Sequence, residues 1–192
     1  MKYFLRAYHI FLSLVLIYTL GFILTHGVDI VDFLSHISNL VSILTAGIFL
    51  YLGITDSKKL DSLRALSAVY VVSVGIAFSV LIENSGVIIE YPWVSFVQHK
   101  LVPVAVVLEW IINPPSRKFE IKDTFIWLIF PSAYFLYTQI YGYFANWYPY
   151  SFLDPQANGY LSVFIYFLGV VIGGWIISLI TIFIGNKLRK KN

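Results

Sequence analysis

Six apolar stretches, with basic residues on alternate sides of them, constrain the fold of this chain more than any other feature. They cover residues 7–25, 33–53, 65–83, 96–112, 124–143 and 160–184. Each is long enough to cross a bilayer, whose hydrocarbon core of about 30 Å needs about 20 helical residues. Twelve of the 13 basic residues would share one side of the membrane, namely Lys2, Arg6, Lys58, Lys59, Arg64, Arg117, Lys118, Lys122, Lys187, Arg189, Lys190 and Lys191. The positive-inside rule therefore predicts six crossings with both termini in the cytoplasm, and five crossings are the alternative count.

Composition supports the same class. Apolar residues make up 59% of the chain and charged residues 12%, which leaves too little polar surface for a soluble fold of this size. We expect one all-α integral membrane domain, residues 1–192, in the cell membrane. The pI near 9 does not indicate nucleic-acid binding, since the basic residues lie where anionic lipid headgroups attract them. The absence of cysteine excludes disulfides and thiol chemistry, and nothing in the sequence predicts a cofactor or a metal.

A polar stripe runs along the second stretch. Ser35, Ser38, Ser42 and Thr45 recur at spacings of three and four, with Asn39 one position off their line. Residues at this spacing share one helix face, and exposing an asparagine to lipid is costly. We therefore expect the stripe to face protein or a wet cavity.

Ser35 and His99 are expected at one depth. The second and fourth stretches both run inward, and each residue lies in the first turn of its stretch, close to the outer surface. A serine hydroxyl becomes a good nucleophile when a histidine takes its proton. The topology thus predicts a catalytic pair, although a lone histidine at a helix end is more often structural.

Two segments carry a resemblance to a known family. The segment Phe33-Leu34-Ser35-His36-Ile37-Ser38-Asn39-Leu40 resembles the part of the androgen-induced protein family that holds its nucleophilic threonine. The segment from His99 to Pro103, followed by Leu108-Glu109-Trp110, resembles the family's histidine segment, most closely in its bacterial six-helix branch. The long stretch from Pro131 to Pro155 also looks like that branch. The likeness covers nearly the whole chain, with serine in place of threonine and proline four residues after the histidine, not five as in animal members.

The resemblance implies an integral-membrane hydrolase, since animal members cleave fatty acid esters of hydroxy fatty acids. Ser35 would match the nucleophile and His99 the catalytic histidine, with membrane lipids and a lipid ester as partners. Replacing threonine by serine keeps the hydroxyl, but it also fits a noncatalytic member. Asp154 is the first choice to orient His99, in a 147–155 loop that could cover the site, with Asp32 and Glu90 close behind. Asn39 and the free amides at the start of the second helix are candidate oxyanion donors.

Glu109 lies ten residues after His99, about 15 Å deeper by helical rise. This places it near the midplane, where a carboxylate is costly unless it is paired, protonated or hydrated. We expect a structural hydrogen bond to Tyr134, Tyr137 or Gln139. The alternative is a role in proton relay or transport.

Three other functions compete with hydrolysis. In a small-solute transporter, Glu109 and the Ser35-to-Thr45 stripe would line the pathway. In a metal or haem protein, the ligands would come from His26, Asp29, Asp32, His36 and His99. In a noncatalytic scaffold, Ser35 would be structural. The small-residue pattern Gly169-x-x-x-Gly173 favours close helix packing within the chain, with a homo-oligomer seam as the lesser alternative.

Overall fold

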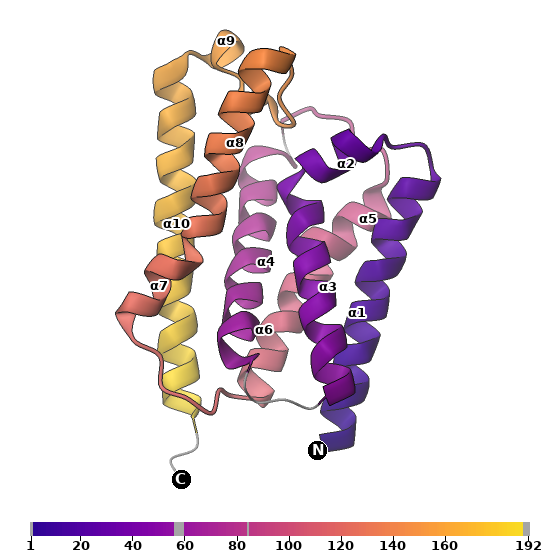
Figure 1. The fold of residues 1–192 in the computed structure, drawn as a ribbon, viewed down its shortest axis with the longest axis vertical. Coiled ribbons are helices and arrows are strands. Elements are labelled where there is room, and N and C mark those ends of the chain that lie inside the picture. Colours follow the sequence, from indigo (N-terminus) through magenta and orange to yellow (C-terminus); the bar gives the residue numbers. More distant parts are fainter. Residues whose placement is uncertain (1, 56–59, 84, 190–192) are drawn as a thin grey trace.

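The structure, a computed structural model, describes residues 2–55, 60–83 and 85–189. Within them the chain is a helical bundle without strands (Figure 1). The helices are α1 (Lys2–Thr25), α2 (Ile30–Ser35), α3 (Ile37–Thr55), α4 (Asp61–Leu81), α5 (Pro92–Phe96), η2 (Val97–Leu101), α6 (Val102–Ile112), α7 (Ile121–Trp127), α8 (Ile129–Ala145), η3 (Ser151–Leu153), α9 (Pro155–Asn158) and α10 (Tyr160–Leu188). The predicted all-α class is confirmed.

Five helical segments in the described residues are long and apolar enough to cross a membrane: α1, α3, α4, the continuous α5–η2–α6 segment and α10. The fifth predicted stretch, 124–143, is divided into α7 and α8 at Leu128. Pro131 explains the break, because proline has no amide hydrogen to donate to the carbonyl of Trp127 four residues earlier. The Tyr70 hydroxyl donates to that carbonyl instead, at 2.8 Å.

Helix α4 lies at the centre of the bundle and packs against α3, α6 and α10, while α1 packs along α3. Figure 1 shows α8 and α10 on one side of α4, and α1 and α3 on the other. The core between these helices is built from large apolar side chains, among them Leu16, Phe49, Val69, Val102 and Val106. Packing against α4 therefore holds both halves of the bundle together.

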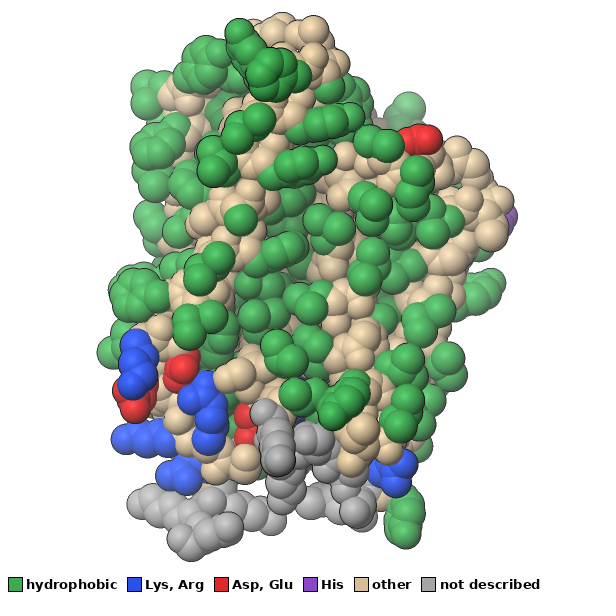
Figure 2. All heavy atoms as spheres, viewed as in Figure 1, with side chains coloured by type: hydrophobic (Ala, Val, Ile, Leu, Met, Phe, Trp, Pro, Cys, Tyr) green, Lys and Arg blue, Asp and Glu red, His purple; other side chains and the backbone are tan. Residues whose placement is uncertain are grey.

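Charge gathers at one end of the molecule. Apolar side chains cover most of the face in Figure 2, while Lys and Arg side chains cluster at the end where α1 begins and α10 ends. We call this the basic end and the opposite one the far end. Of the residues predicted to share a side, Lys58, Lys59, Lys190 and Lys191 lie outside the described residues.

The prediction that Gly169 and Gly173 pack closely within the chain is wrong. A Cβ atom added to either glycine would meet nothing within 4 Å in the described residues. Gly174 and Gly185 are the glycines of α10 that face the bundle, and an added Cβ at Gly174 would lie 3.8 Å from Leu128 and from Ser73. The spacing of Gly169 and Gly173 places them on a different face of α10.

Candidate functional site

A cavity of about 370 Å³ opens in the far half of the bundle. We call it the His99 cavity. Its walls come from α3, α4, the α5–η2 segment, α8, α10 and the loop between α8 and α10. Its polar lining includes Asp32, His36, Ser38, Asn39, Glu90, Ser95, Gln98, His99 and Tyr150, and most of the rest is apolar. Small-molecule sites typically have this size and this balance of apolar walls with few polar groups.

His99 lies in a π-helical turn, η2, inside an otherwise α-helical segment. Pro103 lies four residues after His99 and cannot donate an amide hydrogen to its carbonyl, so the regular helical ladder is interrupted there. Gly75 of α4 comes so close that an added Cβ would lie 2.6 Å from the His99 carbonyl oxygen. Single π-turns inside α-helices are frequent at functional sites. The sequence around His99 therefore gives it a distorted backbone that is closely held by α4.

The hydrogen bonds of His99 define its tautomer. Its Nδ1 lies 2.9 Å from the Ser95 carbonyl oxygen and 3.2 Å from the Ser95 hydroxyl. A carbonyl oxygen only accepts, so Nδ1 carries the hydrogen in this contact and Nε2 of the neutral ring is the basic nitrogen. The ring also stacks on Phe78 at 4.0 Å. His99 is thus held in a fixed orientation with the tautomer that a general base on Nε2 requires.

Ser35 ends α2, where the chain turns at the extended residue His36 before α3 begins. The predicted continuous helix over 33–53 is therefore broken. The Ser35 hydroxyl donates to the Val31 carbonyl at 2.7 Å, and the Ser35 carbonyl accepts from the Tyr134 hydroxyl at 2.7 Å. Ser35 is buried and is not among the residues that line the His99 cavity. The structure shows no hydrogen bond between Ser35 and His99 within the described residues.

Asn39 connects the polar stripe to the histidine segment. Its amide donates to the Phe33 carbonyl at 3.0 Å, and its side-chain oxygen accepts from Gln98 at 3.1 Å. Both Asn39 and Gln98 line the cavity. The stripe therefore faces protein and the cavity at Ser38 and Asn39, as expected, and one hydrogen bond links it to the residue before His99.

Tyr150 lies against the start of α3. Its ring meets that of His36 edge to face at 5.3 Å. Burial raises the pKa of Tyr150 to about 12, although the Ser38 hydroxyl and the backbone at Ser38 and Ile37 lower it. The phenol therefore stays protonated at neutral pH and can donate a hydrogen bond at the polar part of the cavity.

Asp154 does not contact His99. It caps α9, where its carboxylate accepts from the Gln156 amide at 2.8 Å, and it is not a cavity-lining residue. The loop that contains it does cover the cavity, through Pro149, Tyr150, Phe152 and Leu153. The orienting partner of His99 in the structure is the Ser95 carbonyl, one turn earlier on the same segment.

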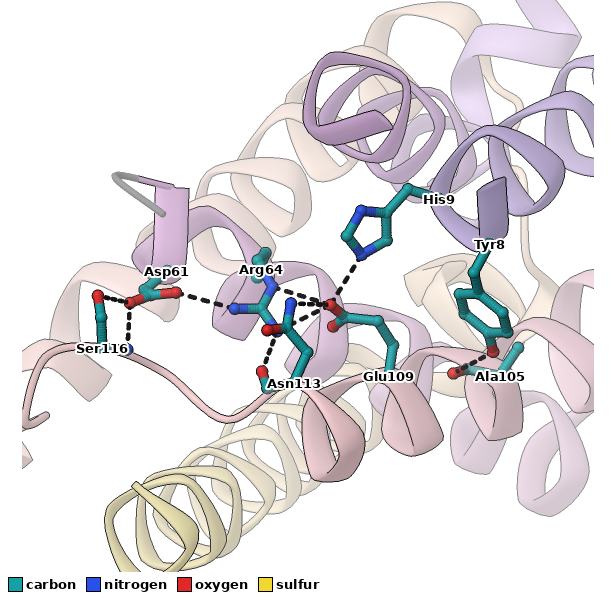
Figure 3. A network of polar contacts seen from close by, with 8 residues as sticks. All are labelled: Tyr8, His9, Asp61, Arg64, Ala105, Glu109, Asn113 and Ser116. Carbon is teal, nitrogen blue, oxygen red and sulfur yellow. Dashed lines mark hydrogen bonds and ion pairs between the residues drawn. The ribbon is translucent and has the colours of Figure 1, made fainter. Parts of the chain in front are cut away.

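Glu109 makes none of the predicted contacts with α8. It lies one turn before the end of α6, toward the basic end of the bundle. Figure 3 shows its contacts. Its carboxylate accepts from His9 of α1 at 2.9 Å, from Arg64 of α4 at 2.8 Å and from Asn113 at 2.9 Å. Glu109 does not line the His99 cavity. Tyr134 is bonded to Ser35, and Gln139 donates to the Leu153 carbonyl.

Arg64 extends these contacts to the loop after α6 (Figure 3). Its guanidinium donates to Asp61 at 2.8 Å and to the Asn113 carbonyl, and Asp61 accepts from the Ser116 amide at 2.6 Å. His9, Asp61, Arg64, Glu109, Asn113 and Ser116 form what we call the Glu109 network. Its titratable members are all less than 5% exposed. The network joins α1, α4 and α6 and leaves few of its charges to the solvent.

The predicted metal ligands do not converge. Within the described residues, no group of three or more His, Cys, Asp or Glu side chains has a geometry that could hold a metal ion. Asp29 caps α2, and His26 bonds to the Phe22 carbonyl of its own helix. His36 and Asp32 form a single pair at 3.7 Å.

Several residues that shape the two sites were not predicted. Ser95, Gln98 and Tyr150 complete the His99 cavity, while His9 and Arg64 complete the Glu109 network. The proline four residues after His99 was a usable signal for the π-turn. A second signal was the set of titratable residues within apolar helices, His9, Arg64 and Glu109. His9 and Arg64 lie near the starts of α1 and α4 and Glu109 near the end of α6, and all three therefore lie toward the basic end.

Comparisons of the chain with protein-family models, with curated proteins and with solved structures find no match. Function is accordingly inferred from the geometry of the His99 cavity and the Glu109 network.

Proposed function

We propose that the protein is a multi-pass membrane hydrolase that cleaves lipid esters in the His99 cavity. The observation that carries this proposal is the orientation of His99. Its Nδ1–H is held by the Ser95 carbonyl, which makes Nε2 the basic nitrogen of a residue that lines a mostly apolar cavity. A general base in apolar surroundings suits an ester bond attached to hydrocarbon chains.

The proposed topology has six crossings, with the α7–α8 segment as the fifth, and places the basic end in the cytoplasm. The clustering of Lys and Arg at the end where α1 begins and α10 ends supports this orientation (Figure 2). The His99 cavity then lies in the outer half of the cell membrane. Ester groups of membrane lipids lie near the headgroup boundary, so a substrate reaches His99 with its chains still in hydrocarbon.

In the proposed reaction, Ser35 is the nucleophile, as the resemblance to the androgen-induced family suggests. Its hydroxyl leaves the Val31 carbonyl by rotation about the Cα–Cβ bond and gives its proton to His99 as Oγ bonds to the ester carbon. The ester C–O bond then breaks, and His99 returns the proton to the departing alcohol. Water, activated by the same histidine, releases the fatty acid. Tyr150 and the first amides of α3 are placed to stabilise the oxyanion.

A variant of this mechanism is favoured by the hydrogen bond between Ser35 and Val31. In it, His99 takes a proton directly from a water molecule that attacks the ester, and Ser35 only shapes the turn between α2 and α3. Transport has less support, since Glu109 is bound within its network and lies outside the cavity.

Labelling with a fluorophosphonate probe tests the proposal on the detergent-purified protein. We expect covalent labelling of the native chain that Ser35→Ala and His99→Gln both abolish. Ser42→Ala is the matched control, because Ser42 is a buried serine of the same stripe that lies about two helical turns further from the far end than Ser35. If an ester is hydrolysed without probe labelling, and Ser35→Ala keeps that activity, water is the nucleophile. If neither labelling nor hydrolysis depends on His99, the hydrolase proposal fails.

A further inference from the structure

The His99 cavity changes character along its length. The part of α4 that lines it runs from Ile82, near the far end, to Val69, which spans about 20 Å by helical rise. His99 lies at the level of Phe78, on which it stacks. Below that level, toward the middle of the bundle, the lining becomes mostly apolar, with the Tyr70 and Ser73 hydroxyls as the polar groups that α4 contributes. The cavity is therefore lined by polar groups near the far end, and its lining is mainly apolar further toward the middle of the bundle.

The inner end of this space is closed by side chains that are mostly apolar. One hydroxyl there, that of Ser73, is buried without a hydrogen-bond partner in the described residues. The Tyr70 hydroxyl donates to the Trp127 carbonyl, which the break between α7 and α8 leaves free. Trp127 and Leu128 also line the cavity. A long space that is apolar apart from the Ser73 hydroxyl fits a fatty-acyl chain better than a polar solute, which would lose its hydration and gain few hydrogen bonds.

Gly174 of α10 lies at this inner end. A Cβ atom added to it would lie 3.8 Å from the Leu128 side chain and from the Ser73 hydroxyl, at ordinary contact distance. The space beside Gly174 is thus bounded by α4 and by the start of α8. A methyl group fits there, whereas a larger side chain would extend into the cavity.

We propose that the cavity takes a single fatty-acyl chain, tail first, and that Gly174 determines the chain length it accepts. The ester lies at His99 and the end of the chain reaches the floor formed by Gly174, Trp127 and Leu128. This inference names the substrate class of the proposed hydrolase site and rests on that function for its activity readout.

Chain-length selectivity of two glycine variants tests the proposal. Gly174→Leu should lower kcat/KM for p-nitrophenyl palmitate about 10-fold or more and leave p-nitrophenyl butyrate unchanged, because filling a hydrophobic pocket by a few methylene groups has effects of this size. Gly173→Leu is the matched control. It changes the neighbouring residue of the same helix, which does not line the cavity and has open space around it. An unchanged chain-length profile in Gly174→Leu, or the same change in both variants, would overturn the proposal.

A binding experiment separates failure of this inference from failure of the hydrolase proposal. A long-chain fatty acid with a terminal diazirine should cross-link to residues around Trp127, Leu128 and Gly174 in the native protein and in Gly173→Leu, but not in Gly174→Leu. If the cross-links form at the floor and are lost in Gly174→Leu, but no ester is hydrolysed, the cavity binds an acyl chain and only the proposed enzymatic activity is contradicted. Cross-links that are absent from the floor, or that are the same in Gly174→Leu, contradict the acyl site itself.

Discussion

The buried polar groups near the two ends of the bundle differ in whether they are paired with one another. In the Glu109 network, polar side chains from three helices bond to one another, and Glu109 alone accepts from His9, Arg64 and Asn113. In the His99 cavity, by contrast, polar side chains converge on an open space and His99 Nε2 has no partner among the described residues. The difference suggests that the first region stabilises the fold, while the second keeps unused hydrogen-bonding capacity for a ligand.

Glu109 and His99, which the sequence singles out as candidate functional residues, have different roles in these two regions. Glu109 and His99 are both isolated titratable residues on the fourth apolar stretch. Arg64 and His9 lie within hydrogen-bond distance of Glu109, so its carboxylate is compensated. His99 has only the Ser95 backbone and hydroxyl on one nitrogen. Partners on neighbouring helices, which sequence spacing does not reveal, decide which of the two is structural.

Breaking the Glu109 network should produce the largest loss of stability. Glu109→Ala removes one of the two carboxylates that pair with the buried Arg64 and leaves only Asp61 among the described residues. Removing one partner of a buried ion pair typically costs about 3–5 kcal/mol. We expect a clear fall in the melting temperature of the detergent-solubilised protein. Glu90→Ala, which removes an exposed carboxylate, should have little effect and serves as the control.

Replacing the pair sharpens this prediction. The double variant Arg64→Met with Glu109→Leu removes both members of this pair, and a well-packed apolar pair is often as stable as a buried ion pair. Asp61 loses Arg64 but still accepts from the Ser116 amide and hydroxyl. The double variant should therefore be more stable than Glu109→Ala. If Glu109→Ala melts like the native protein, the network does not stabilise the bundle.

Pro103→Ala should disturb the His99 cavity without disrupting the fold. The new amide can donate to the His99 carbonyl, which favours a regular α-helical turn over the π-turn and shifts the imidazole. A misplacement of about 1 Å can lower a catalytic rate about 100-fold. Ester hydrolysis measures the effect, and Pro114→Ala, beyond the end of α6, is the control. Full activity in Pro103→Ala would show that the π-turn does not position His99.

The smallest expected effect is at the start of α7. Asp123 accepts from the Glu120 amide at 2.8 Å and pairs with Arg117 at 3.0 Å. Burial raises the pKa of Asp123, but the Glu120 amide and Arg117 outweigh it and bring the pKa below its ordinary value of 3.8. The ionised carboxylate therefore stabilises the fold fully above pH 3.8, and this contribution is lost as the pH falls through the lowered pKa.

Asp123→Ala should accordingly lower stability by about 1 kcal/mol near neutral pH, as expected for a lost helix cap. Thermal unfolding of the native protein and the variant, followed by circular dichroism over a range of pH, measures the difference. The difference in stability between the native protein and Asp123→Ala should become smaller below pH 3.8. A stability difference that stays constant into strong acid would show that the charge of Asp123 does not contribute to the stability of the fold.

The sequence predicted the helical class, the apolar segments and the gathering of positive charge at one end, because these follow from hydropathy and charge along the chain. It did not predict the breaks at His36 and Leu128 or the π-turn at His99, which depend on local backbone bonding and, at two of them, on Pro131 and Pro103. It also misplaced the partners of Glu109. Arg64 was assigned to the inner loop by its charge, yet it reaches back to Glu109 once α4 and α6 pack together.

The candidate pair of Ser35 and His99 shows the same limit. Topology placed both residues in the same half of the bundle, but the rotamer of Ser35, whose hydroxyl bonds to Val31, depends on the turn between α2 and α3. The direction of the Ser35 side chain depends on the extended backbone of the next residue, His36. A helical pattern in the sequence cannot predict that direction.

The most direct test of the account is the rate at which purified native protein and His99→Gln hydrolyse a long-chain p-nitrophenyl ester, with melting temperatures measured on the same samples. Loss of a general base typically lowers the rate about 10²- to 10⁴-fold. We predict a loss of this size in His99→Gln with an unchanged melting temperature, and retained hydrolysis in the Arg64→Met, Glu109→Leu variant. Equal hydrolysis by the native protein and His99→Gln would contradict the assignment of the His99 cavity as the catalytic site.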